Sequence, residues 1–383
     1  MIGGGGREHA LAWRLAASPS VDHVSGAPGN PGMSELGPTF PVDTTDPIAV
    51  AELAEREGHD LVVVGPEAPL VAGVVDELQR RGIPAFGPSA AAANIEGSKA
   101  FAKEVMVAAG APTAGYVATG DVDEAYAALE RFAPPYVVKA DGLAAGKGVR
   151  ICEELADARD AVADILVNRR FGEAGERVVL EEFLHGPERS VFGVCDGEDV
   201  VLLTPAQDYK RALDDDQGLN TGGMGAYAPV PGFGRDEVTH LRNLIFLPVL
   251  RALAERGTPY RGLLYAGLVE TAAGPKLLEF NARFGDPETQ VILPLLASDL
   301  GDLLAASASG HVSDVEVAWH DGAAVTVVLA SGGYPGDYAT GLPIDGVDDV
   351  AAEQLSNFFR RLVWAGVDVA VHRQSGIADR DLL

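Results

Sequence analysis

Residues 277–290 read LLEFNARFGDPETQ, and this stretch decides the fold. Its first half has the alternation of a β-strand, in which Glu279 and Asn281 point to one face. We expect Leu278, Phe280 and Ala282 to line the other face. A carboxylate and an amide oxygen side by side suit Mg²⁺, which takes its other ligands from water and phosphate. The stretch predicts a metal-binding strand; a merely solvated polar face is the alternative, although asparagine is a poor strand former.

The segments around this strand predict a mixed fold of the α/β and α+β classes. Residues 262–281 read as a hairpin that turns at 272–274, and residues 176–203 read as further antiparallel hairpins. Residues 236–257 have the spacing of a long amphipathic helix, and a second helix begins near residue 94 and ends at Gly110 and Pro112. Strands and helices alternate near the start of the chain, which indicates an open parallel sheet through about residue 95.

The composition argues against several classes of partner. The chain of 383 residues carries a formal net charge of −27, which repels nucleic acids and anionic membranes. No apolar run has the length of a membrane span, and no signal peptide is visible. Cys152 and Cys195 form neither a disulfide framework nor a metal-binding spacing. We expect a cytoplasmic protein with no nucleic-acid and no membrane partner, either adapted to high salt or simply acidic.

Lysine is rare in this chain, so each lysine is a candidate for a specific task. Only six of the 29 basic residues are lysines. In VVKADGLAAGKGV (137–149), Lys139 ends a predicted strand and Lys147 lies in a glycine-rich loop. Such lysines and the backbone amides of the loop can hold a polyphosphate. The loop does not match the Walker A pattern, and a surface hairpin with solvated lysines is the alternative.

Two other stretches indicate nucleotide or phosphate contacts. VVLEEFL (178–184) ends a strand whose backbone and apolar side chains could hold an adenine ring, with Glu188 near the ribose; a solvated acidic strand end is the alternative. GGGGREHA (3–10) places backbone N–H groups at the start of a helix, which is a natural phosphate site. It lacks the third glycine of the dinucleotide fingerprint, so a plain tight turn is the alternative.

The stretch DYKRALDDDQGLNTGGMGAY (208–227) combines cations, three consecutive aspartates and glycines. We expect a polar loop that has no fixed shape by itself and that a ligand could order. Lys210 is one of the few lysines of the chain, and it stands beside Arg211 and a glycine-rich loop. The aspartates at 214–216 read as a solvated tip.

Several of these motifs occur together in one order, among them GGGGREHALAW (3–13), EGSKAFAKE (96–104), KADGLAAGKGV (139–149), NTGGMGAYAP (220–229) and EFNARFGDPETQ (279–290). The sequence closely resembles the phosphoribosylamine–glycine ligases of the ATP-grasp superfamily, from residue 1 to about residue 345. The resemblance implies an ATP-grasp fold with an N-terminal open parallel α/β (preATP-grasp) domain at 1–96. An ATP-grasp domain would follow at 97–311, with a lid at about 114–182, and a C-terminal domain at 312–383.

The resemblance also implies a reaction. ATP would phosphorylate the carboxylate of glycine, and the amine of 5-phosphoribosylamine would attack the resulting glycyl phosphate. The products would be glycinamide ribonucleotide, ADP and phosphate, in de novo purine biosynthesis. ATP and Mg²⁺ or Mn²⁺ are the implied cofactors, and a monomer is favoured over an oligomer. The repulsion between two anionic reactants explains the need for lysines and a metal ion, and an acyl phosphate needs shelter from water.

The family's roles carry over onto matching positions of this sequence. The implied ATP-phosphate residues are Lys99, Lys139 and Lys147, and the adenine and ribose residues are Glu181, Glu182, Phe183, Leu184 and Glu188. The implied metal ligands are Glu279 and Asn281. The implied cradle for phosphoribosylamine is Gly5, Gly6, Arg7, Glu8, Pro66 and Glu67. The acyl-transfer site would contain catalytic Lys210, Arg211, Arg283 and Asp286, with Asp208, Asn220, Thr221, Gly222, Gly223 and Met224 around the substrates.

Both ends of the chain depart from the family pattern. The first strand is either very short or missing, and the glycine-bearing strands expected after about residue 350 have no counterpart. Residues 352–383 hold four acidic and four basic side chains, unlike the acidic remainder. We therefore expect an atypical or truncated C-terminal domain. The alternatives to the ligase are another carboxylate–amine ligase, a formate-dependent transformylase, or a non-catalytic nucleotide-binding protein.

Overall fold

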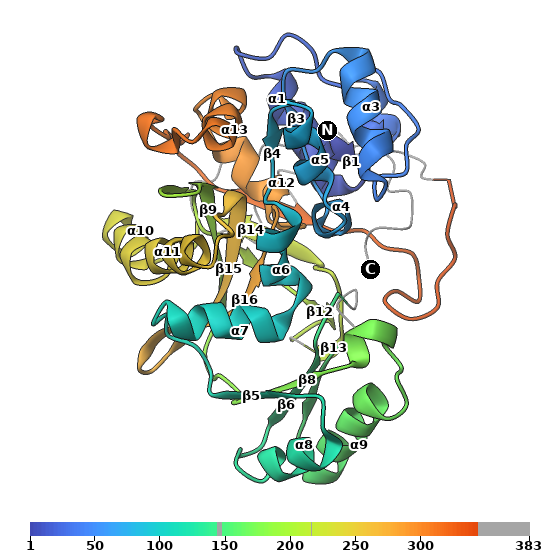
Figure 1. Ribbon diagram of the computed structural model, residues 1–383, viewed down its shortest axis with the longest axis vertical. Helices are drawn as coiled ribbons and strands as arrows, with labels where there is room; N and C mark the ends of the chain where they lie inside the picture. Colours follow the sequence, from blue (N-terminus) through green and yellow to red (C-terminus); the bar gives the residue numbers. More distant parts are fainter. Residues whose placement is uncertain (144–147, 216, 344–383) are drawn as a thin grey trace.

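The computed structural model describes residues 1–143, 148–215 and 217–343. Helices and sheets are mixed throughout, which confirms the predicted fold class. The N-terminal region and the predicted lid, at about residues 114–182, lie at opposite ends of the molecule, with the central sheet between them (Figure 1). Lys147 and the segment after about residue 350, for which the sequence analysis made predictions, lie outside the described residues.

The N-terminal region is built on short parallel strands, as predicted. β1 pairs with β2 and β3 with β4, and a parallel bridge from Ile2 to Val64 joins the two pairs. The strands are β1 (Ile2–Gly3), β2 (Ala27–Pro28), β3 (Val62–Val63) and β4 (Ala85–Phe86). The helices are α1 (Gly6–Ala16), α2 (Pro31–Ser34), α3 (Pro47–Glu57), α4 (Glu67–Val71), α5 (Val74–Arg80) and α6 (Ala90–Gly97). Of the two alternatives for the first strand, the structure has the very short one.

The predicted helix after residue 94 is two helices, α6 and α7 (Lys99–Ala108). They separate at Ser98, whose backbone is extended and whose hydroxyl accepts a hydrogen bond from the Phe101 amide. The Ser98 hydroxyl also donates to Asp141, which accepts a second bond from the Ala100 amide. Serine favours such N-cap positions over helix interiors, so the chain restarts the helix here.

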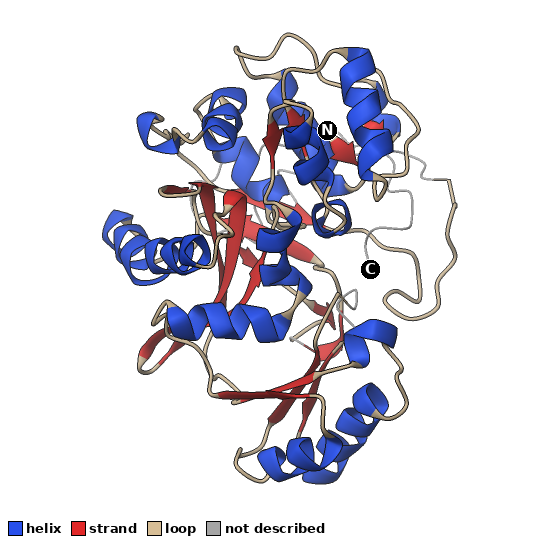
Figure 2. Ribbon diagram, in the orientation of Figure 1, coloured by secondary structure: helices blue, strands red, loops and turns tan. Residues whose placement is uncertain are grey.

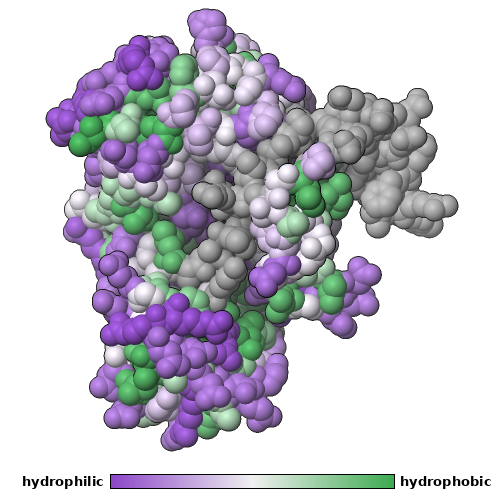
Figure 3. All heavy atoms as spheres, turned by 90° about the vertical axis from the view of Figure 1, so that its right-hand side faces the viewer, coloured by the Kyte–Doolittle hydropathy of each residue, from purple (hydrophilic) through white to green (hydrophobic). Residues whose placement is uncertain are grey.

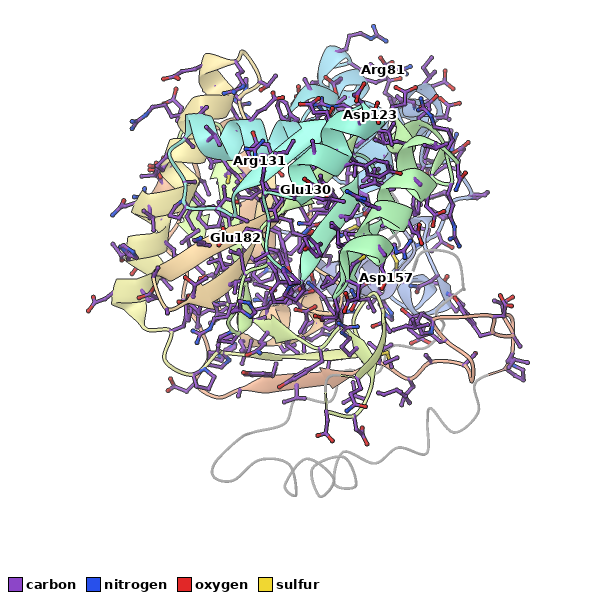
Figure 4. All side chains as sticks on the ribbon, turned by 90° about the horizontal axis from the view of Figure 1, so that it is seen from below. Arg81, Asp123, Glu130, Arg131, Asp157 and Glu182 are labelled. Atoms are coloured by element: carbon purple, nitrogen blue, oxygen red, sulfur yellow. The ribbon has the colours of Figure 1, made fainter. Side chains whose placement is uncertain are left out.

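The lid is a four-stranded antiparallel sheet with its own core. Its strand order is β5-β8-β6-β7, and α8 and α9 cover it (Figure 2). The elements are β5 (Tyr116–Thr119), α8 (Val122–Leu129), β6 (Tyr136–Ala140), β7 (Val149–Cys152), α9 (Leu155–Leu166), η1 (Gly172–Gly175) and β8 (Val178–Glu181). Val138, Ile165 and Leu180 belong to a buried cluster that is separate from the other cores. Exposed carboxylates such as Asp123, Glu130 and Asp157 lie on the outer helices (Figure 4).

The central sheet contains the strand with Glu279 and Asn281. Its antiparallel order is β10-β9-β15-β16, and the predicted hairpin at 262–281 is β15 and β16. The elements are β9 (Glu188–Asp196), β10 (Val200–Leu202), α10 (Arg235–Leu241), η2 (Arg242–Phe246), α11 (Leu247–Glu255), β15 (Arg261–Thr271) and β16 (Gly274–Asn281). The predicted long helix is present, but η2 is a π-helical turn. It lies just before Pro248, which has no N–H to donate to the preceding turn.

A β-bulge in β16 makes one predicted face assignment wrong. Glu279 pairs with Gly267 and Leu277 pairs with Leu268, so Leu278 has no partner in the register. An extra residue in one strand reverses the alternation on either side of it. Leu277 therefore packs in the central core with Phe280 and Ala282. Leu278 instead packs against a small cluster that contains Leu184.

The predicted polar loop at 208–227 contains more regular structure than expected. It forms the strands β11 (Gln207–Asp208), β12 (Arg211–Leu213), β13 (Gln217–Asn220) and β14 (Gly225–Ala228). β12 and β13 form a hairpin, and β14 lies between β11 and β17 (Ala324–Val327). Backbone pairing with β17, about 100 residues away, gives the 208–227 segment order that its composition does not indicate.

The remaining elements are α12 (Thr289–Ile292), η3 (Leu293–Leu295), α13 (Leu300–Ser309) and η4 (Val312–Asp314).

The surface is mixed in polarity. Hydrophilic residues cover much of the face in Figure 3, with apolar patches between them. Within the described residues, none of the helices combines the length and the apolar character needed to cross a membrane.

Candidate active site

The glycine turn before α1, where the sequence predicts substrate binding, contacts the side chain of Glu8, which pairs with Arg7. Gly5 is the N-cap of α1, and its amide donates to Oε2 of Glu8 at 2.8 Å. The other oxygen, Oε1, lies 2.5 Å from Nε of Arg7, and both side chains are buried. Arg7 also donates to the carbonyl of Phe284. Glu8 therefore braces the turn, and Arg7 joins it to the LLEFNARFGDPETQ segment.

Arg283 fastens the same two regions together a second time. Its Nε lies 3.3 Å from Oε2 of Glu67, and Nη2 lies 3.2 Å from Oε1 of Glu96. Glu67 begins α4, directly after Pro66, and Glu96 also accepts a hydrogen bond from the Ala282 amide. Burial opposes the charge of Arg283, but Glu96 and Glu67 outweigh it and raise its pKa. The predicted substrate cradle and the predicted metal strand are thus one continuous structure.

Glu279 carries a carboxylate on which the positive charges of three lysines act. Because Glu279 pairs with Gly267 and Asn281 with Tyr265, the two side chains share a face, as predicted. Burial alone would raise the pKa of the Glu279 carboxyl. Lys210, Lys139 and Lys99 outweigh burial and lower that pKa. The carboxylate is therefore kept ionised, which is the state in which it can bind a metal ion.

A metal ion at Glu279 and Asn281 would need further ligands from water and from the substrate phosphates. In the described part of the chain, no group of three or more His, Cys, Asp or Glu side chains is arranged to hold a metal ion. Glu279 and Asn281 supply only two oxygen donors. This set fits Mg²⁺, which is bound by one or two protein oxygens together with waters and substrate phosphates.

Lys139 and Glu181 meet in the lid rather than at a ligand. Oε1 of Glu181 lies 2.9 Å from Nζ of Lys139, and Oε2 lies 2.9 Å from Nζ of Lys103. All three side chains are buried, so the Glu181 side chain is occupied by the two lysines. Burial raises the pKa of Glu181, but Lys139 and Lys103 outweigh it and lower the pKa. In this state only the backbone of Glu181 is left to meet a nucleotide.

Lys99 begins α7 and points toward the loop before the undescribed residues 144–147. Its Nζ donates to the carbonyl of Gly142 at 2.9 Å. Burial lowers the pKa of Lys99, and Glu279 partly offsets this effect. Lys99 and Lys139, which lie on α7 and β6, therefore approach one carboxylate from different elements.

Lys210 is the third lysine at Glu279 and is surrounded by acidic groups. Its Nζ lies 3.7 Å from Asp208 and 3.6 Å from Glu188. About a third of its side chain is exposed, and burial opposes its charge. Tyr265 and Asp208 reverse that effect and raise the pKa of Lys210 well above its ordinary value. Lys210 therefore remains a cation, beside the strand that carries Glu279.

Glu288 is close enough to Lys210 and Asp208 for their charges to act on it. The sequence motifs do not indicate a role for Glu288. Its Oε1 accepts a hydrogen bond of 3.2 Å from Ser190, whose hydroxyl also contacts Tyr265 at 2.8 Å. Burial, followed by the negative charge of Asp208, raises the pKa of Glu288 to about 7, against the opposing effect of Lys210. A carboxyl group with this pKa can hold or release a proton near neutral pH.

The NTGGMG loop packs against the GDPET segment. Thr221 donates its hydroxyl hydrogen bond to the Lys210 carbonyl, and the Gly222 amide donates to Tyr334. Gly223 has φ +131°, and a Cβ atom there would lie 2.4 Å from Cδ of Pro287. Only glycine allows this approach, so the loop and the segment around Asp286 are held side by side.

Some predicted residues are held elsewhere or remain exposed. Arg211 donates to the Gly218 carbonyl within its own hairpin, and Asn220 is exposed. Glu182 accepts a bond from the Gly115 amide, and Phe183 stacks edge-on against His185. Met224, by contrast, lies in the loop itself, where its amide donates to Tyr209. Gly6 is the first residue of α1, and Asp286 accepts a 2.6 Å bond from Gln290.

Sequence reasoning missed Lys103, Glu96 and Glu288. Lys103 is one of only six lysines, so the scarcity of lysine was a signal that could have found it. Glu96 and Glu288 lie within or beside quoted motifs, but their partners lie far away in the sequence. Nothing in the local pattern distinguishes them from solvated carboxylates.

Comparison with known proteins decides the family. Residues 1–96 match the model of the phosphoribosylglycinamide synthetase N domain, and residues 97–289 match that of its ATP-grasp (A) domain. The phosphoribosylamine–glycine ligase of Streptomyces coelicolor is 54% identical over 355 residues, which is 92% of this chain and 83% of that protein. The chain belongs to the phosphoribosylamine–glycine ligase family. Its ATP-grasp domain makes it an ATP-dependent ligase of purine biosynthesis.

Solved structures agree with this assignment. The crystal structure of the Thermotoga maritima phosphoribosylamine–glycine ligase is 34% identical, with a TM-score of 0.77, over 90% of this chain and 84% of that one. The biotin carboxylase domain of Hydrogenobacter thermophilus 2-oxoglutarate carboxylase is only 18% identical, with a TM-score of 0.63, over 85% of this chain and 72% of that one. The second likeness shows the ATP-grasp fold alone. The division of the chain at residues 96 and 311 remains a prediction.

Proposed function

We propose that this chain joins glycine to 5-phosphoribosylamine at the expense of ATP, giving glycinamide ribonucleotide, ADP and phosphate. The observation that carries the proposal is the approach of Lys99, Lys139 and Lys210 to Glu279 in a member of the phosphoribosylamine–glycine ligase family. Three lysines from separate elements around one carboxylate suit a polyanion held together with a metal ion.

In the first step, an oxygen of the glycine carboxylate attacks the γ-phosphorus of ATP. The bond from that phosphorus to the bridging oxygen breaks, giving glycyl phosphate and ADP. Two anions must approach each other, so cations have to offset their repulsion. Lys99 and Lys139 would contact the phosphates, and Lys210 would meet the glycine carboxylate. The charges of all three lysines act on Glu279, which supports this assignment. The residues of VVLEEFL would hold the adenine and ribose, chiefly through backbone and apolar contacts.

The metal ion is proposed to be Mg²⁺ or Mn²⁺, held by Glu279 and Asn281. When bound, it would neutralise phosphate charge that the lysines alone leave uncompensated. The lowered pKa of Glu279 and its shared face with Asn281 support this assignment.

In the second step, the amine of phosphoribosylamine attacks the glycyl carbonyl carbon, and phosphate leaves with its bonding electrons. The amine gives its proton to the departing phosphate, and the amide bond is complete. The turn at Gly5 and Gly6, with Arg7 and Glu67, would hold the phosphoribosyl part, because Arg7 and Arg283 fasten this turn to the metal strand. Asp286 belongs to the segment after the metal strand, and its Oδ2 would lie 4.0 Å from a Cβ atom built at Gly5. Closure of the lid would keep water from the acyl phosphate.

The proposal also covers the location of the protein in the cell and its oligomeric state. We place it in the cytoplasm, where its metabolic substrates are made, and favour a monomer. A different carboxylate–amine ligase is the competing activity, because ATP-grasp enzymes share the phosphate lysines and the Glu/Asn pair.

The test is the identity of the product. The purified chain is incubated with ATP, Mg²⁺, ¹³C-glycine and freshly formed phosphoribosylamine, and the products are analysed by mass spectrometry. We expect labelled glycinamide ribonucleotide, and no equivalent product when formate or alanine replaces glycine. A labelled product with another amine acceptor, but not with phosphoribosylamine, would overturn the proposal.

A further inference from the structure

Lys103 is a buried lysine to which the proposed reaction gives no task. It lies on α7, and only 2% of the residue is exposed. Its Nζ donates to Oγ1 of Thr113 at 2.9 Å and lies 2.9 Å from Oε2 of Glu181. The ring of Tyr116 lies 6.0 Å away. Burying an ammonium group is costly unless it is paired, so this position needs a reason.

Its partner, Glu181, is shared with Lys139. The two oxygens of Glu181 lie at the same distance, 2.9 Å, from the two ammonium groups. The three side chains together carry a net charge of +1. If Lys103 were absent, Glu181 and Lys139 would form a neutral pair, and Lys139 would have little charge to offer a phosphate.

The three residues also connect two parts of the fold. Lys103 lies on α7, which packs against β16 and α11 of the central body. Thr113, which Lys103 contacts, donates to the Leu277 carbonyl of β16. Lys139 and Glu181 lie on the paired lid strands β6 and β8. Lys103 is therefore held by the body and reaches Glu181 in the lid.

We propose that Lys103 is a positioning residue: it engages one oxygen of Glu181, so that the other oxygen orients Lys139 without neutralising its charge toward the phosphates of ATP. The inference rests on the proposed ATP-dependent function. The competing explanation is that Lys103 only fills and stabilises the junction between α7 and the lid.

The charges of substituted triads separate the two explanations. Lys103→Met lowers the net charge from +1 to 0, and Glu181→Gln raises it to +2. The double variant, with both substitutions, returns it to +1. A role through charge predicts that nucleotide affinity follows this order. A packing role predicts that each substitution harms binding and that the double variant is no better than Lys103→Met.

The experiment measures binding of a non-hydrolysable ATP analogue with Mg²⁺ by titration calorimetry, which does not depend on turnover. We expect Lys103→Met to bind about tenfold more weakly. We expect the double variant to recover to within about threefold of the unaltered chain, because only neighbouring groups couple in this way. Lys276→Met is the matched control, because Lys276 pairs at 3.5 Å with Glu182, which directly follows Glu181 in the chain. The affinity of that variant should change less than about twofold.

Several outcomes would overturn the inference. Unchanged affinity in Lys103→Met would overturn the positioning role. A double variant that binds no better than Lys103→Met would leave Lys103 with a packing role. If Lys103→Met does not fold, Glu181→Gln alone decides between the two roles. The charge role predicts that Glu181→Gln binds the ATP analogue at least as tightly as the unaltered chain. The packing role predicts weaker binding. If the unaltered chain binds the analogue but makes no glycinamide ribonucleotide, the proposed function fails while the positioning role is still decided by these affinities.

Discussion

Nε of Arg283 lies 3.3 Å from Oε2 of Glu67, and this ion pair joins the segment after β16 to the start of α4. The other side of the guanidinium meets Glu96 at 3.2 Å. A planar guanidinium can meet two carboxylates at once, which a lysine cannot do with the same geometry. The place where phosphoribosylamine is proposed to bind is thereby fixed relative to the place where glycine would be activated.

Arg283→Leu should destabilise the protein. It leaves Glu67 and the buried Glu96 without their cation, so the free energy of unfolding should fall by about 3 kcal/mol. Urea unfolding measures this change. Arg80→Leu is the control, because Arg80 makes a solvent-exposed pair with Glu77 and its loss should cost far less stability. Equal losses in the two variants would show that Arg283 does not connect the two regions.

Glu279→Gln should weaken the response to metal while the fold survives. The substitution keeps the shape of the side chain but removes the charge among the lysines. We expect the Mg²⁺ concentration at half-maximal turnover to rise by at least about tenfold. Circular dichroism should show an unchanged fold, and Glu130→Gln, on the outside of the lid (Figure 4), should behave like the unaltered chain. An unchanged Mg²⁺ dependence in Glu279→Gln would refute the metal assignment.

Glu288 should make the protein less stable as the pH rises. Its pKa is about 7 in the folded chain and 4.5 as the ordinary value. Between these values the folded chain holds a proton that the unfolded chain has released, so stability falls with rising pH. The loss is on the order of 3 kcal/mol and is complete above the folded pKa.

Glu288→Gln should remove this part of the pH dependence. The free energies of unfolding are compared at about pH 5 and about pH 8, where the difference should be smaller in the variant. The same pH dependence in both proteins would mean that Glu288 titrates at its ordinary value.

Gly223→Ala should impair the protein more than Gly274→Ala. Both glycines have positive φ, +131° and +104°, so alanine is strained at each, at a cost of about 1 kcal/mol. Only at Gly223 would the new Cβ meet another group, Pro287, at 2.4 Å. Turnover and melting temperature of the two variants should therefore separate, with Gly274→Ala losing only stability. Equal turnover would show that the NTGGMG loop need not lie against Pro287.

Local periodicity explains which parts of the fold could be predicted. The hairpin of β15 and β16 and the shared face of Glu279 and Asn281 follow from alternation along one strand. The place of Leu278 does not, because the bulge depends on how β16 pairs with another strand. The break at Ser98 likewise depends on Asp141, which lies more than 40 residues away.

The same distinction holds for the candidate site. Residues that are predicted to contact a ligand through a glycine loop or a strand end carry a local motif, and their ligand contacts remain predictions. Lys103, Glu96 and Glu288 act through other side chains, and their partners Glu181, Arg283 and Ser190 are about 80 to almost 190 residues away. Such pairs become visible only when the strands and helices are assembled.

The most direct test of the ligase activity is ADP release by the purified chain, with glycine and phosphoribosylamine supplied together and then omitted in turn. We expect sustained release with both substrates. When either is absent the rate should be lower by about tenfold or more, because the acyl phosphate is held for the amine. ADP release that is indifferent to both substrates would contradict the proposed function. So would tight ATP binding without turnover when both are present.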